Sequence, residues 1–155
     1  MNDPIYQLNR MRLPHGAIWM EFDPIDLLLI EWDGQDADHE RVKDNARAGH
    51  AASLWINRQC LCSVGLADRR GGVGEAWAVI DNNLKSKYPI LLTRGAKHAI
   101  DIGVKYMGLR DVQMYLQFSR TDAMKWAKAL GFNPEGELIF HKHPEQNHAI
   151  FCRSF

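Results

Sequence analysis

Long apolar runs are missing from this sequence. Its longest aliphatic stretch is LLLI, and its opening, MNDPIYQLNRMRLPHG, carries charges and helix breakers where a signal peptide has a continuous apolar segment. A helix that spans a bilayer needs about 20 mostly apolar residues. We therefore expect neither a membrane-spanning segment nor export through a cleaved leader.

Net charge is missing as well. Lysine and arginine together number 19, and aspartate and glutamate also number 19. A chain without a basic excess has no long-range field to hold a phosphate backbone, so nucleic acid is not expected as the main partner. Hydrophobic residues make up 46% of the chain and include five tryptophans, which is typical of a globular protein.

Cysteine is scarce, and its spacing excludes several roles. The three cysteines cannot all pair, and Cys60 and Cys62 are two positions apart in a strand-like run, where their side chains share a face without disulfide geometry. CLC also lacks the two-residue spacer of a metal knuckle, so we interpret these cysteines as small core residues. A reducing cytoplasm is the location that fits this usage.

Metal-ligand sets are also incomplete. His141, His143 and His148 surround the predicted turn PEQ, and two histidines two apart on a strand can share a metal. No cysteine or carboxylate is placed to complete a tetrahedral set with them. We therefore expect surface histidines on a hairpin and no metal site.

The first half of the chain predicts two helices followed by a meander. At 155 residues the chain fits one domain, 1–155, in which residues 1–22 receive no assigned structure. FDPIDLLLIEW has a helix start at Asp23-Pro24, and DADHERVKDNARAG is a more polar helix that ends at Gly49. AASLWI, CLCSVGLA and EAWAVI are then separated by turn signals, which predicts an antiparallel meander. EAWAVI is apolar in both phases, so it is predicted to be central and covered on both faces.

The second half predicts a long helix, a strand, a short helix and a closing hairpin. Apolar residues recur three or four apart from Pro89 to Met107, and Gly108 supplies a left-handed cap. DVQMYLQFS alternates between an apolar and a polar face. Ser119 with Asp122 has capping-box spacing for the next helix, which Gly131 ends. Ala123, Trp126 or Ala127, and Leu130 are predicted to form one packed stripe of this helix. GELIFHKH and NHAIFCRSF are interpreted as strands.

From Asp23 to its end, this order of elements resembles the Gcn5-related N-acetyltransferase (GNAT) family. The stretch AMKWAKALGF carries most of the likeness, because Ala123, Gly131 and Phe132 fall on fixed places of the family helix Asn-x-x-Ala-x-x-x-Tyr-x-x-x-Gly-Phe. WINRQCLCSVGLA is similar to the family's hairpin with a Val-Gly pair. The resemblance implies an α/β (α+β) fold, a mixed and mostly antiparallel twisted sheet with helices on both faces.

The same resemblance implies an activity and a ligand. Family members transfer an acetyl group from acetyl-CoA to an amine, so acetyl-CoA and an unknown amine acceptor are the expected partners. In the family, the central strand and the strand after the long helix splay apart, and the pantetheine arm of coenzyme A enters the gap. The helix that begins near Ser119 would form one wall of that slot.

A second likeness gives an alternative function. GVGEAWAVID followed by YPILLTRGAKHAI is similar to divergent acetyltransferase-like proteins of short-tailed phages, a group that includes internal virion proteins. That likeness implies a catalytically inactive virion or assembly protein with other virion proteins as partners, located in the host cytoplasm or the particle.

The sequence also departs from the family pattern. The pyrophosphate loop, which holds phosphate on glycine-rich backbone amides before the long helix, is replaced by DNNLKSKYP, which has no glycine. RRGGVG matches the loop motif as text, but it precedes the predicted central strand and is interpreted as a hairpin turn. The family's Asn and Tyr positions fall on Arg120 and Ala127.

Two residues are candidates for the catalytic roles. Glu75, near the start of the predicted central strand, is at about the place where several family members carry a base. The alternative is a solvent-facing carboxylate beside a turn. Tyr115, on the polar face of the next strand, is the candidate to replace the missing acid, and its alternative is cross-strand packing.

The resemblance also implies where coenzyme A would bind. Lys85, Ser86 and Lys87 precede the long helix, where a serine and two cations would partly replace glycine amides, although a solvated loop explains them equally well. The full set of implied coenzyme-binding residues is Val79, Ile80, Asn82, Lys85, Ser86, Lys87, Ser119 and Arg120.

Overall fold

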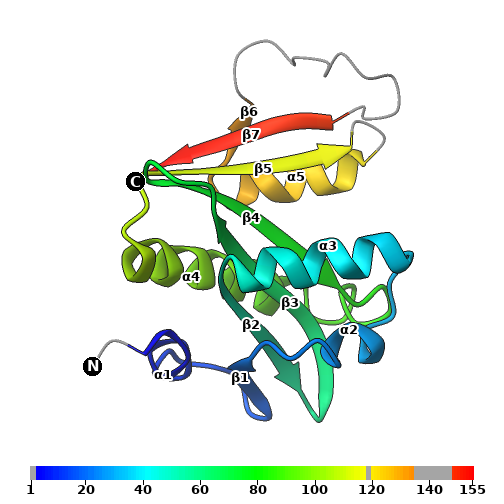
Figure 1. Ribbon diagram of the computed structural model, residues 1–155. Helices are drawn as coiled ribbons and strands as arrows, with labels where there is room; N and C mark the ends of the chain where they lie inside the picture. Colours follow the sequence, from blue (N-terminus) through cyan, green and yellow to red (C-terminus); the bar gives the residue numbers. More distant parts are fainter. Residues whose placement is uncertain (1–2, 118–119, 135–147) are drawn as a thin grey trace.

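A seven-stranded sheet organises the chain (Figure 1), in the order β1-β2-β3-β4-β5-β7-β6. The computed structural model describes residues 3–117, 120–134 and 148–155. Every neighbouring pair of strands is antiparallel except β4 and β5, which run parallel. The predicted strand GELIFHKH lies outside the described residues, as do His141 and His143.

The N-terminal segment has structure that the sequence analysis does not assign. Helix α1 (Pro4–Asn9) is capped by Asp3, whose Oδ1 accepts a hydrogen bond from the Ile5 amide at 2.9 Å. Strand β1 (Ala17–Glu21) forms one edge of the sheet beside β2. The Asn9 side chain bonds to both backbone groups of Trp19 at 2.8 Å, which ties α1 to β1.

Two helices cover one face of the sheet. They are α2 (Asp26–Leu29) and α3 (Asp36–Arg47), which contact β2 and β3. Helix α2 is a single turn that begins after the predicted start at Asp23-Pro24. Its Asp26 is directed into the protein, where Oδ2 accepts a hydrogen bond from Ser53 Oγ at 2.6 Å, and Ser53 Oγ lies 2.7 Å from Ser63 Oγ. This buried polar group anchors the turn to the sheet.

The predicted meander is confirmed as β2 (Gly49–Ile56), β3 (Gln59–Asp68) and β4 (Val73–Ile80). The turn between β3 and β4 contains Arg70, Gly71 and Gly72, all with positive φ, so RRGGVG is a hairpin as expected. β4 is the fourth strand of seven, and its two faces contact different hydrophobic clusters through Ala76 and Val79. Ala78, predicted to be covered, is exposed.

The long helix is confirmed with the predicted bounds. Helix α4 (Pro89–Met107) ends at Gly108, whose φ of 68° gives the expected left-handed cap. It covers the sheet face opposite α3 (Figure 1). Small residues let it approach closely, because a Cβ on Gly103 would lie only 2.8 Å from Leu66 Cδ1.

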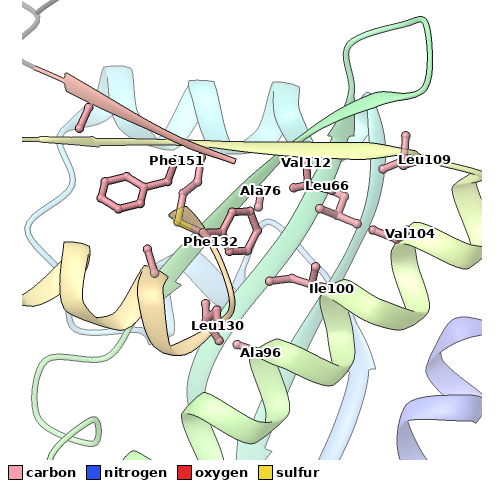
Figure 2. Packing of buried hydrophobic residues seen from close by; sticks show 13 residues of the cluster. Leu66, Ala76, Ala96, Ile100, Val104, Leu109, Val112, Leu130, Phe132 and Phe151 are labelled. Carbon is pink, nitrogen blue, oxygen red and sulfur yellow. The ribbon is translucent and has the colours of Figure 1, made fainter. Parts of the chain in front are cut away.

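The C-terminal part completes the fold with β5 (Asp111–Gln117), α5 (Thr121–Ala129), β6 (Asn133–Pro134) and β7 (His148–Ser154). The N-cap of α5 falls on Arg120, one residue after the predicted Ser119, which lies outside the described residues. Gly131, with a φ of 92°, follows the helix as expected. Figure 2 shows Phe132 and Leu130 packed with Ile100 of α4 and Val112 of β5.

The first two cysteines are buried core residues, as predicted. Cys60 and Cys62 are free thiols with 2% and 0% exposure. Burial raises the pKa of Cys60 to about 12 and also raises the pKa of Cys62, because a desolvated thiolate is unfavourable.

Candidate functional site

The sheet opens between β4 and β5. Their parallel pairing covers only Val73–Asp111, Gly74–Val112 and Glu75–Gln113, although β4 continues to Ile80 and β5 to Gln117. Beyond Glu75, β4 keeps its pairing with β3 on one side and has no ladder partner in β5 on the other. This divergence is the one that the family resemblance implies, and it leaves strand backbone facing a gap.

Small and apolar side chains form the floor of this opening on the α4 side. An apolar cavity of about 20 Å³ lies there, next to Ala76, Ala78, Met114 and Leu130. Such a volume accommodates about one water molecule. The β4–β5 opening therefore has an apolar floor on its α4 side. The small side chains of β4 determine how deep the opening is above this floor.

Trp126 lines the side of this floor between helices α4 and α5. Its indole Nε1 donates to Thr93 Oγ1 at 3.1 Å, which joins α5 to the first half of α4. The predicted helical stripe is confirmed, since Ala127 and Leu130 are fully buried and Trp126 is half-buried. Ala127, at the position of the family's Tyr, provides no hydroxyl.

The two catalytic candidates lie on the opposite face of the sheet. Glu75 is paired in register with Gln113, so the two side chains share a face, and Tyr115 shares it because side chains alternate along a strand. The neighbouring Val112 and Met114 are buried against α4 and α5. Tyr115 is 41% exposed, and its hydroxyl donates to Gln113 Oε1 at 3.4 Å. The structure thus brings Glu75 and Tyr115 to one face at the mouth of the opening.

Glu75 is held by an arginine. Arg69 Nε donates to Glu75 Oε2 at 2.7 Å, and Arg69 also donates to Asn45 Oδ1 on α3 at 2.7 Å. The Glu75 side chain is 21% exposed. It therefore differs from the simple solvent-facing carboxylate of the alternative interpretation, because α3 and the hairpin both position it.

The loop after β4 uses its backbone amides internally. Asp81 is 6% exposed, and its carboxylate accepts hydrogen bonds at 2.9 Å from the amides of Glu31, Asn83 and Leu84. The Asn82 amide donates to the Glu31 carbonyl at 2.8 Å. These amides are therefore not free to hold phosphate. Glycine serves in the family loop to present amides to phosphate, so a loop whose amides are already bonded needs no glycine.

The three predicted phosphate contacts have different surroundings. Lys85 is half-buried and lies near Asp122 at the start of α5. Burial acts to raise the pKa of the Asp122 carboxyl, but hydrogen bonds from Arg120 and the Ala123 amide, together with the charges of Arg120 and Lys85, lower it. Ser86 is exposed, and its hydroxyl lies 3.5 Å from the Asn83 carbonyl. Lys87 lines a different pocket, next to residues 11–14.

The remaining coenzyme candidates occupy different surroundings. Val79 is buried against the α2 side, and Ile80 is half-buried on the α4 side. Asn82 and Arg120 are exposed, and Arg120 Nε lies 3.3 Å from Asp122 Oδ1. Ser119 lies outside the described residues. The site includes Ala78, Asp81 and Trp126, which the sequence analysis did not select.

Within residues 3–117, 120–134 and 148–155, no three His, Cys, Asp or Glu side chains lie close enough together to bind a metal ion. In the same part of the chain, no helix combines the length and the apolar character that crossing a bilayer requires.

Comparison with solved structures identifies the fold. An acetyltransferase from Streptococcus agalactiae superposes with a TM-score of 0.70 at 12% identity, covering 91% of this chain and 99% of that one. Ard1 from Thermoplasma volcanium gives 0.70 at 9% identity, with 90% and 97% covered. A chimera of the spermidine N-acetyltransferase SpeG from Vibrio cholerae and hSSAT gives 0.67 at 12%, with 90% and 95% covered.

Sequence comparison alone finds no such relative. No protein-family model matches the chain, and no curated protein matches it. The structural likeness nevertheless extends over nearly the whole length of both partners in each comparison. The chain therefore has the GNAT acetyltransferase fold, as the sequence predicts.

Proposed function

We propose that this protein is an N-acetyltransferase that transfers an acetyl group from acetyl-CoA to an amine. The observation that carries the proposal is the divergence of β4 and β5 after Glu75–Gln113, in a chain with an acetyltransferase fold. Fold alone does not define function, so the proposal depends on the residues at this opening.

The opening fits the pantetheine arm of the coenzyme. That arm contains amides that need backbone partners and an apolar body that needs an apolar floor. Beyond Glu75, β4 has backbone groups without a partner in β5, and Ala78 and Met114 offer the small and apolar surface. The exposed Ala78 is the strongest sign of fit, because a longer side chain there would fill the opening.

The chain's own residues would perform the proton transfers on the other face. Bound acetyl-CoA supplies a thioester carbonyl as the electrophile for the amine. Glu75 would take a proton from the ammonium at a carboxylate oxygen, while Arg69 keeps the side chain in place. The Tyr115 hydroxyl, on the same face, would give a proton to the departing sulfur. Phe22 and Trp77, whose rings lie 5.6 Å apart, add apolar surface near this face.

Side chains would hold the phosphate end. Because Asp81 engages the amides of Asn83 and Leu84, phosphate contacts fall to Lys85, Ser86 and the exposed Arg120. Charged side chains on a loop contribute less than a set of oriented amides in a dry site, so we expect modest affinity for the coenzyme.

The experiment is an assay for thiol release from acetyl-CoA with a panel of amines. Spermidine and a peptide with N-terminal alanine are suitable first acceptors, since structural neighbours include a spermidine N-acetyltransferase and a ribosomal-protein-S5-alanine acetyltransferase. Glu75→Gln should lower the rate with the best amine by about 100-fold or more. Glu40→Gln, an exposed carboxylate on α3, is the matched control and should leave the rate unchanged.

A second candidate function has its own supporting observations. The amides held by Asp81 and the buried Ala127 at the family's Tyr position favour a protein that keeps the fold without catalysis, such as the virion or assembly protein that the phage likeness implies. Acetyl-CoA that gives neither a calorimetric signal nor a thermal shift, together with the chain's presence in purified virions by mass spectrometry, would favour this function over the enzyme.

A further inference from the structure

A second pocket lies on another side of α4. Its volume is about 530 Å³, and it lies between residues 11–14 and the first half of α4. This volume is in the range of small-molecule sites. Thr93 contacts α5, whereas Arg94 and His98 line this pocket, so the helix separates it from the β4–β5 opening. The two cavities share no lining residue.

The pocket has an apolar wall that is partly open to solvent. Its apolar lining consists of Met11, Leu13, Pro14, Tyr88, Pro89, Ile90 and Leu91. Ile90 is 71% exposed, although it stands at the start of a long, well-packed helix. A ligand that covered this wall would remove apolar surface from water.

Basic side chains surround the same wall. Arg12, Lys87, Arg94 and His98 line the pocket, and its described lining contains no aspartate or glutamate. None of these four side chains forms an ion pair with a described residue. In a chain with equal numbers of acidic and basic residues, this is a local concentration of one sign of charge.

We propose that this pocket binds an aliphatic phosphate monoester. The aliphatic body would lie on Leu13, Ile90 and Leu91, and the phosphate among Arg12, Lys87 and Arg94. Three permanent cations match a phosphate dianion better than a carboxylate, and guanidinium groups can bind phosphate with two parallel hydrogen bonds. The apolar wall distinguishes this ligand from inorganic phosphate.

The test is calorimetric titration of the full-length protein with hexyl phosphate. Inorganic phosphate, hexanol and heptanoate are the comparison ligands. Inorganic phosphate lacks the alkyl chain, hexanol lacks the charge, and heptanoate lacks the second negative charge. We expect each to bind at least about tenfold more weakly than hexyl phosphate. Heptanoate that binds as tightly as hexyl phosphate would overturn the phosphate assignment.

Variants locate the site. The double substitution Arg12→Ala with Arg94→Ala should weaken hexyl phosphate by about thirtyfold, and Ile90→Ser by about fivefold. Lys97→Ala removes an exposed cation of α4 outside the pocket and is the matched control, with no expected change.

Acetyl-CoA binding shows whether this pocket is separate from the coenzyme site. Acetyl-CoA affinity in the Arg12/Arg94 double variant should equal that of the wild type if the two sites are separate. An equal loss of affinity for acetyl-CoA and hexyl phosphate would overturn a separate site. Wild-type protein that binds no hexyl phosphate, or a double variant that binds it as well as the wild type, would reject the pocket itself.

Discussion

The two halves of β4 share the neighbour β3 on one side, but only the first half pairs with β5 on the other side. Residues 74 and 75 pair with both β3 and β5, whereas residues 76–80 pair with β3 and diverge from β5. The first half completes the sheet, and the second half leaves backbone and the exposed Ala78 at an opening. One strand therefore contributes both to the stability of the fold and to the candidate site.

The carboxylates at the two ends of the opening, Glu75 and Asp81, also have different hydrogen-bond partners. At the paired half, Glu75 is fixed by Arg69 from the hairpin. Beyond the open half, Asp81 turns back and binds the amides of its own loop. Each end of the opening thus has a carboxylate that is held within the protein: among the described residues, Glu75 is held through Oε2 alone and Asp81 through both of its oxygens.

The largest expected effect is on the loop that ends the open half. Asp81→Ala would leave three backbone amides without the carboxylate that now binds them. We expect the free energy of unfolding to fall by about 2 to 4 kcal/mol, because buried hydrogen bonds to a charged group are lost. Chemical denaturation measures this. Asp81→Asn keeps part of the acceptor and should cost less, and equal losses in both variants would contradict the assigned role.

Two matched substitutions compare the covered and exposed alanines of β4. Ala76 is 6% exposed in the core, so Ala76→Met should overpack it and cost about 1 to 3 kcal/mol of stability. Ala78→Met should cost less than about 0.5 kcal/mol, since Ala78 is exposed, but should weaken acetyl-CoA at least about tenfold by filling the opening. Thermal unfolding and calorimetry measure the two effects. Reversed results would show that the faces are misassigned.

The lysines beyond the open half offer a smaller effect. Lys85 lies near Asp122 of α5, and Lys87 lines the pocket on the other side of α4. Lys85→Ala should weaken acetyl-CoA by about fivefold, on the order of 1 kcal/mol, with less difference at high salt. Lys87→Ala should change it less. Calorimetry at two salt concentrations makes the comparison, and a larger effect of Lys87 would place the phosphates on the pocket side.

The smallest effect concerns pH. His50 lines the apolar floor, and burial lowers its pKa from 6.5, opposed by Asp3 and Glu21. The unfolded chain therefore takes up a proton first as pH falls below about 6.5, so acidification destabilises the fold. Stability should fall as the pH decreases below about 6.5, and His50→Gln should flatten this part of the profile. A profile unchanged by the substitution would show that other groups cause it.

The regular elements were predictable because their signals are local. Residues 89–107 show helical periodicity. Pro89 begins the helix and Gly108 ends it, as the backbone preferences of proline and glycine predict. The hairpin of RRGGVG likewise depends on its own glycines. Helix α1 and strand β1 are short, and their apolar and polar residues do not follow a clear helical or strand period. No periodic signal in the sequence therefore identifies them.

The candidate site was less predictable because it depends on how strands diverge. EAWAVI is apolar in both phases, which predicts a strand covered on both faces, yet Ala78 is exposed because β5 separates from β4 before reaching it. Asp81 did carry a local signal, since an Asp that bonds amides two and three residues later is typical of a turn or cap. Trp126 was assigned to the packed stripe, but its bond to Thr93 depends on tertiary structure.

Amide hydrogen exchange with and without acetyl-CoA would show whether the coenzyme binds in the β4–β5 opening. Binding there should add protection at residues 76–80 of β4 and 114–116 of β5, and should cause no change at residues 74 and 75, which already pair with strands on both sides. Protection that is absent throughout, or that occurs around residues 11–14 and 87–98 instead of the β4–β5 opening, would contradict it.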